Sequence, residues 1–278
     1  INALTTMLVG SVDAQLPPEY LYRPAGFGRD VQDGWWVVTK YNCMGCHQVA
    51  IGQQSALQSL PQYQGDEKFK LPPPLVGEGA RVDPNWLAHF LENPAMSKTD
   101  TNRNGVRNYL QVRMPTFYLS DNEIQKLVRF FAGMSVQSTP YIPPRLAPLT
   151  DAERAMARAL FTHPAAPCLK CHATGNPAHD KDATAPNFLL ARERLKPGWT
   201  QRWITEPAKI APGTAMPSGL FRREGERWVF NGPLPASISS YPRDHADLLV
   251  RYMFQMTPQE QAALLGRTPS SVPAPGGR

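Results

Sequence analysis

The residues most able to do chemistry are four cysteines and the two histidines that follow them. They form two C-x-x-C-H motifs and account for every Cys in the chain. Two thiols three positions apart lie on one helical turn, where each can form a thioether with a haem vinyl group, and the adjacent imidazole then lies beneath the iron as its proximal ligand. The spacing therefore predicts two covalently attached haem c groups. Their attaching residues are Cys43, Cys46 and His47, then Cys168, Cys171 and His172.

A single C-x-x-C pair has two other uses. It can be half of a zinc site, or it can be a redox-active dithiol that happens to precede a His. Zinc needs four ligands, and each motif would have to take the missing ones from elsewhere. Because the two copies are alike and no further Cys remains, the sequence favours haem.

The ligand on the other side of the iron decides between electron transfer and ligand chemistry. Met114 and Met216 each follow their own motif, and each is followed by Pro in a loop before a predicted helix. A core methionine does not show this matched placement, so we predict both as axial ligands. A His ligand at the second haem is the alternative, and it would lower that haem's potential. The remaining candidates are His89, His163, His179 and His245.

An internal repeat determines the predicted architecture. The pattern R-x-x-P-x-W-x-x-x-aromatic-aliphatic-x-x-P-A begins at Arg81 and again at Arg194, a shift of 113 residues (81 to 194). So many positions in register indicate a duplication. Each copy predicts a short helix with its Trp and second aromatic one turn apart. Arg81, Arg194, Trp86 and Trp199 are predicted donors to haem propionates, although core packing explains the Trp pair equally well.

The same shift relates Pro73 to Pro186. A ligating imidazole normally donates its other N–H to an acceptor, often a backbone carbonyl. We therefore predict that Pro73 and Pro186 present their carbonyls to His47 and His172. The alternative is that they are turn prolines only.

Helices must carry these motifs. Asp30 is a predicted N-cap for a helix with Val31, Trp35 and Val38 on one face. Capping boxes at Ser120–Glu123, Thr150–Glu153 and Thr257–Glu260 predict three further helix starts. The helix after Thr150 has an expected apolar face of Ala155, Met156, Ala159 and Leu160, and 228–232 suggests a hairpin. The predicted divisions are an N-terminal arm (1–30), a first domain (31–134), a Pro-rich linker (135–149), a second domain (150–266) and a loose tail (267–278).

Composition sets broader limits. A hydrophobic content of 42% is typical of a soluble globular protein, and no apolar run is long enough to span a bilayer. The formal charge of +6 omits the haem propionates, so it is weak evidence for an acidic partner, and no nucleic-acid partner is expected. Covalent haem is assembled outside the cytoplasm, which predicts a periplasmic or other extracytoplasmic location. Residues 1–14 fit an arm, the end of a signal peptide or the end of a membrane anchor.

The order of helix, C-x-x-C-H, Pro-x-Leu loop, Met-Pro and terminal helix resembles class I cytochrome c domains, over 31–134 and again over 150–256. The resemblance implies an all-α fold of two tandem cytochrome c-like domains with long Pro-rich loops. It also implies His and Met as axial ligands, a Pro carbonyl supporting each His, and crossing first and last helices. The chain departs from that pattern by its long loops before Pro73 and before Met114, and by an insertion at 221–244. These additions suggest contact surface for a larger complex.

The resulting functional hypothesis is a di-haem c-type cytochrome that carries single electrons between a donor and an acceptor protein, as a subunit of a membrane-associated respiratory or photosynthetic complex. The chain is then not itself an enzyme. One alternative is a di-haem peroxidase or a thiosulfate-type oxidoreductase, which needs an open or displaceable haem ligand. Another is a docking subunit whose haems are passive relays.

Overall fold

A computed structural model describes residue 4, the ranges 24–95, 114–166, 168–174, 180–234 and 236–264, and residue 178. The predictions for residues 1–14 and for the tail therefore lie outside the described residues, apart from Leu4. The described part is mainly helical and contains two separate hydrophobic cores, one built from the N-terminal half and one from the C-terminal half. None of its helices is long and apolar enough to cross a membrane.

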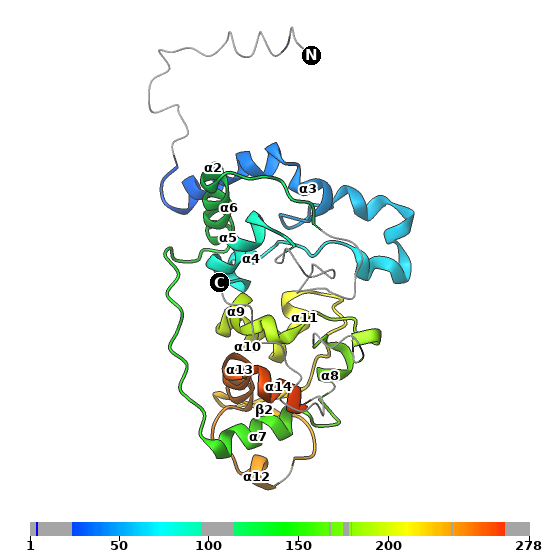
Figure 1. Cartoon of the computed structure of the whole chain (residues 1–278), viewed down its shortest axis with the longest axis vertical. Coiled ribbons are helices and arrows are strands. Elements are labelled where there is room, and N and C mark those ends of the chain that lie inside the picture. The colour runs from blue at the N-terminus through cyan, green and yellow to red at the C-terminus, as the bar shows by residue number, and fades with distance from the viewer. Residues whose placement is uncertain are drawn as a thin grey trace.

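The N-terminal half is organised by two helices that pack against each other along their length, α2 and α6 (Figure 1). Gly34 makes the close approach possible, because a Cβ at this position would collide with the Cβ of Phe130. Phe130 is fully buried where the helices meet. The elements of this half are α2 (Phe27–Lys40), α3 (Cys43–Cys46), the 3-10 helices η2 (Ala56–Ser59), η3 (Pro61–Tyr63) and η4 (Gly65–Lys70), α4 (Glu78–Arg81), α5 (Pro84–Glu92) and α6 (Asp121–Met134).

The start of α2 differs from the prediction. The helix begins at Phe27 after Gly26, whose φ of 53° is in the left-handed region that favours glycine. Asp30 is therefore in the first turn, where its charge complements the helix dipole, and is not the N-cap. The buried face is also rotated from the predicted one: Val37 and Val38 are buried, whereas Trp35 is 37% exposed.

The C-terminal half repeats the helical order and adds a hairpin. Strands β1 (Phe221–Glu224) and β2 (Arg227–Phe230) pair antiparallel, with Glu224 opposite Arg227. The hairpin is confirmed, but its turn is at Gly225–Glu226, before the predicted 228–232. The helices are α7 (Asp151–Phe161), α8 (Cys168–Cys171), η5 (Asp180–Asp182), η6 (Phe188–Leu190), α9 (Ala191–Arg194), α10 (Pro197–Thr205), α11 (Pro207–Ile210), α12 (Ala236–Ser239), α13 (His245–Gln255) and α14 (Pro258–Leu264).

Local capping signals located the helix starts well. Reciprocal side-chain and backbone hydrogen bonds form the predicted boxes at Ser120–Glu123 and Thr150–Glu153. The Thr257–Glu260 pair also bonds reciprocally. The predicted face of α7 was right for Leu160 and Met156, which lie in or against the core, and wrong for Ala155 and Ala159, which are exposed. Its buried residues are Glu153, Ala157, Leu160 and Phe161.

The two halves meet through the repeated segments. Residues 135–149 run from α6 to α7 along one side of the molecule, drawn in green in Figure 1. Helices α4 and α5 contact α10 and α9 respectively. An isolated antiparallel bridge joins Val82 to Leu195 between them.

Candidate haem-binding sites

The first C-x-x-C-H motif lies at the end of α2. Cys43 to Cys46 form the single turn α3, which follows Asn42 in a left-handed conformation (φ 51°). The Nδ1–H of His47 donates to the carbonyl of Pro73 over 2.8 Å. A carbonyl oxygen can only accept, so in the neutral imidazole the proton is on Nδ1 and Nε2 is the unprotonated nitrogen. The N–H of Leu75 donates to Gln48 O over 2.8 Å and holds this loop beside the motif.

The second motif has the same arrangement. The Nδ1–H of His172 donates to the carbonyl of Pro186 over 2.7 Å. The carbonyl of Cys171 accepts from Thr184 N–H and Ala185 N–H, each over 3.0 Å, which holds the Pro186 loop in register. Burial lowers the pKa of His172, the hydrogen bond to Pro186 opposes this, and the Arg194 guanidinium lowers it further. The net result favours the neutral imidazole that metal ligation needs.

The first cysteine of each motif lacks the electrostatics of a reactive thiol. Burial raises the pKa of Cys168 to about 11 and also raises that of Cys43. Redox-active C-x-x-C pairs and zinc sites instead stabilise the thiolate. Among the described residues, no three His, Cys, Asp or Glu side chains are grouped as a separate metal site.

Both predicted axial methionines lie against the core of their own half. Met114 is partly buried and packs on the same core as Cys43 and Met44. Met216 is partly buried and packs on the core that Cys168 also contacts, and its N–H donates to Thr214 Oγ1 over 3.2 Å. Each methionine is thus in the hydrophobic surroundings of its own C-x-x-C-H motif.

The other histidines have surroundings of their own. His89 is exposed on α5, 3.9 Å from Glu92, and His163 packs against Phe230 at a centroid distance of 5.5 Å. His245, at the start of α13, is 1% exposed. Its Nδ1 accepts from Phe230 N–H over 3.2 Å inside the second core. His179 lies outside the described residues.

The Trp residues of the repeat each stack on the aromatic one turn later. Trp86 and Phe90 stack at 5.0 Å, and Trp199 and Trp203 stack at 5.2 Å, as the repeated helix predicted. Buried indole N–H groups usually find an acceptor. Within the described part of the chain, Trp86 Nε1 and Arg81 Nε are buried without one. Two such donors suit an anionic acceptor of the haem-propionate kind.

The arginines of the repeat cross from one half to the other. The Arg81 guanidinium lies over the ring of Trp199 at 6.0 Å, and the Arg194 guanidinium lies over Trp86 at 5.9 Å. Arg81 also pairs with the buried carboxylate of Glu78. The four predicted propionate donors are therefore brought together where the halves meet.

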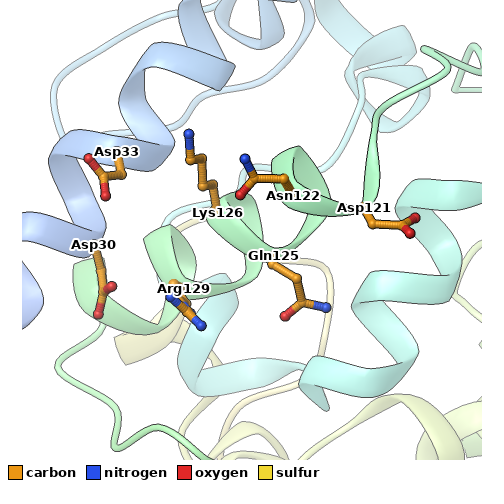
Figure 2. Close-up of a pocket in the computed structure, with 7 residues that line it drawn as sticks. All are labelled: Asp30, Asp33, Asp121, Asn122, Gln125, Lys126 and Arg129. Carbon is orange, nitrogen blue, oxygen red and sulfur yellow. The ribbon is translucent and has the colours of Figure 1, made fainter.

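A polar pocket of about 410 Å³ lies elsewhere, on the outer side of the N-terminal half between α2 and α6 (Figure 2). None of the predicted haem residues is among its described lining residues. They are Asp30, Asp33, Asp121, Asn122, Gln125, Lys126 and Arg129.

One family model, described as Cytochrome c, matches residues 31–135. The first half of the chain is therefore similar to a cytochrome c domain, which supports a c-type cytochrome with covalently bound haem and a role in electron transfer. No curated protein and no solved structure matches the chain. The match ends just after α6. The interpretation of the second C-x-x-C-H motif as a haem site therefore depends on the internal repeat and on the geometry of that motif.

Proposed function

We propose that the protein is a di-haem c-type cytochrome that passes single electrons between two redox proteins at the extracytoplasmic face of a membrane. The observation that carries the proposal is the hydrogen bond from His Nδ1 to a Pro carbonyl, present in both halves at 2.8 and 2.7 Å. Each bond orients an imidazole beside a C-x-x-C pair and leaves Nε2 for iron. A bound haem supplies the one-electron Fe(III)/Fe(II) couple.

The chain provides a matching ligand set in each half. Cys43 and Cys46 would hold the first haem, and His47 and Met114 would supply its iron ligands. A thioether ligand favours ferrous iron and raises the potential. The equivalent set in the second half is Cys168, Cys171, His172 and Met216. Ligands held against a packed core change little between oxidation states, and this suits electron transfer.

Hydrogen-bond donors at the contact between the halves would complete the haem sites. Arg81 Nε and Trp86 Nε1 are buried donors without a partner in the described part of the chain, and propionate oxygens would satisfy them. The Arg194 guanidinium contributes to lowering the pKa of His172, which supports its assignment to the second site. We infer that the propionate-binding residues of both domains adjoin at the contact between the halves.

Exposed apolar residues support docking onto other subunits of a membrane complex. Ile51 follows the first motif by four positions and is 89% exposed, and Tyr118, four positions after Met114, is also 89% exposed. Trp36 on α2 is 70% exposed. Large exposed aromatics are enriched at protein interfaces. These residues flank the elements that would hold the first haem.

The first test is the mass of the intact native protein, which should include two covalent haems. Replacing Cys168 and Cys171 by Ala should remove one haem and leave the other. A single haem in the native protein would refute the di-haem proposal.

The second test is a redox titration followed by optical and EPR spectra. Two low-spin haems with a Met-to-iron absorption band are expected. A high-spin haem with an open position would favour the peroxidase or thiosulfate-type alternative.

A further inference from the structure

The contact between the halves has local twofold symmetry. The bridged residues Val82 and Leu195 are equivalent in the repeat (82 to 195, the same 113-residue shift), so they lie on the symmetry axis. Asp83 N–H donates to Arg194 O over 2.8 Å, and Lys196 N–H donates to Arg81 O over 2.9 Å. These two bonds are symmetry mates. A surface of this kind can pair with its own copy as well as with its repeat.

One pair of equivalent positions carries opposite charges and so departs from the symmetry. Position 83 is Asp and position 196 is Lys. Asp83 caps its own helix by accepting from Asn85 N–H over 2.9 Å. Lys196 reaches across the contact, where its ammonium donates to Gly79 O over 2.7 Å and lies 4.3 Å from the ring centroid of Tyr141 in the linker.

The Lys196 side chain is costly to bury without these partners. The residue is 7% exposed, and burial lowers the pKa of its ammonium while the nearby Asp83 carboxylate opposes that effect. An unpaired charge at such a depth is strongly unfavourable. The carbonyl of Gly79 is therefore the principal hydrogen-bond acceptor that makes this burial acceptable.

If two copies of the same half paired through this surface, the side chain at position 83 or 196 would meet an unfavourable neighbour. In a pair of N-terminal halves, Asp83 would face the carbonyl of Gly79, and two acceptors cannot bond. In a pair of C-terminal halves, each Lys196 would approach Arg192, the repeat equivalent of Gly79. The Arg192 carbonyl could accept, but the Arg192 and Arg194 guanidinium groups would add positive charge around the ammonium. Only unlike halves combine the Lys196 donor and a carbonyl acceptor with the Glu78 and Asp83 carboxylates, which offset the basic residues.

We propose that Lys196 selects the partner of this surface: it makes the C-terminal half bind the N-terminal half and disfavours pairing between two copies of either half. The recognition element is one buried ammonium between the Gly79 carbonyl and the Tyr141 ring. This selection fixes which two redox domains face each other. None of the contacts of Lys196 involves a predicted haem ligand.

The test uses the full-length holoprotein with a protease site introduced at 143–147, beyond Tyr141. After cleavage of the folded protein, native mass spectrometry and sedimentation measure the dissociation constant of the two halves. The wild-type halves should remain together as a heteropair. Lys196→Met should weaken the pair about ten- to a hundredfold, because it removes a hydrogen bond from a charged donor. Lys209→Met is the matched control, since that lysine is 76% exposed, and it should leave the constant unchanged.

Exchanging the charges at positions 83 and 196 tests the specificity of the pairing separately from its packing. Lys196→Asp should weaken the heteropair more than Lys196→Met does. Adding Asp83→Lys should recover at least tenfold, because the new lysine can donate to the carbonyl of Arg192 by the same symmetry, while the carboxylate introduced at position 196 offsets the nearby arginines. Far-UV circular dichroism of each uncleaved variant checks its fold, and Lys196→Met provides the answer if Lys196→Asp does not fold.

Three results would overturn the proposal. They are separation of the wild-type halves at micromolar concentration, a Lys196→Met constant within twofold of wild type, and homodimers of either half as abundant as the heteropair. Haem loss would be seen separately in the masses, so failure of the proposed function and failure of this inference are distinguishable.

Discussion

Replacing Glu153 by Gln should destabilise the C-terminal half substantially. Glu153 Oε1 accepts from Arg251 over 2.9 Å and from Tyr241 Oη over 2.8 Å, while Oε2 accepts from Thr150 N–H over 3.0 Å. Arg251 is 1% exposed, and its other partner is the Asp247 carboxylate 2.9 Å away, so losing the Glu153 carboxylate leaves a buried guanidinium with one of its two counter-charges. The Arg251 bond, followed by the Thr150 N–H, lowers the pKa of Glu153 from its ordinary 4.5 to about 2. At 1.36 kcal/mol per unit, this corresponds to about 3 kcal/mol at neutral pH.

Gln is the informative substitution because it can still close the capping box, so the change isolates the ion pair. Guanidinium unfolding at pH 7, followed by circular dichroism, should show a loss of about 3 kcal/mol. Glu123→Gln is the matched control, since Glu123 closes the equivalent box on α6 but pairs with Lys40, whose side chain is 61% exposed. Its effect should be much smaller. Equal effects of the two substitutions would refute the reasoning.

The same ion pair predicts a pH dependence. The folded-state pKa of Glu153 is depressed, so its stabilisation is complete above pH 4.5 and is lost as the pH falls toward about 2. The difference in unfolding free energy between wild type and Glu153→Gln should therefore shrink over that window. A difference that stayed constant from pH 7 to pH 2.5 would show that the carboxylate charge is not its source.

Further substitutions test the helix contact and the axial ligands. Gly34→Ala should cost about 2 kcal/mol or more in thermal unfolding, because the new Cβ collides with Phe130 and lies 2.8 Å from Lys126 O. Gly198→Ala, with no described atom within 4 Å of the new Cβ, should be neutral or stabilise by up to about 1 kcal/mol. Met216→Ala should convert the second haem alone to a high-spin EPR signal, and Met114→Ala the first. Unchanged low-spin spectra in both variants would remove the methionines as ligands.

Local signals were read from the sequence with the most success. The boxes at Ser120 and Thr150 are complete within four residues, so no distant contact is needed to predict them. The face of α7 could not be predicted in this way. Glu153 is buried there because Arg251, 98 positions away, supplies its counter-charge. A carboxylate at a helix start ordinarily indicates a solvated turn.

Some residues of the candidate sites were likewise predicted from the sequence, and others were not. The Pro73 and Pro186 carbonyls were predicted as partners of His47 and His172 from the shared repeat shift, and the structure contains both hydrogen bonds. Lys196 and Gly79 were missed. The available signal was the opposite charge at positions 83 and 196 of the repeat.

The sequence by itself determined the two C-x-x-C-H motifs, the Met-Pro pairs and the duplication, because each is a pattern of residue types at short or constant spacing. Only the tertiary structure decided that the duplicated segments meet each other, with Val82 opposite Leu195 and each Arg over the other half's Trp. That arrangement depends on the fit between surfaces far apart in the chain. Spacing along the sequence does not encode such a fit, and a single buried lysine distinguishes the two halves within it.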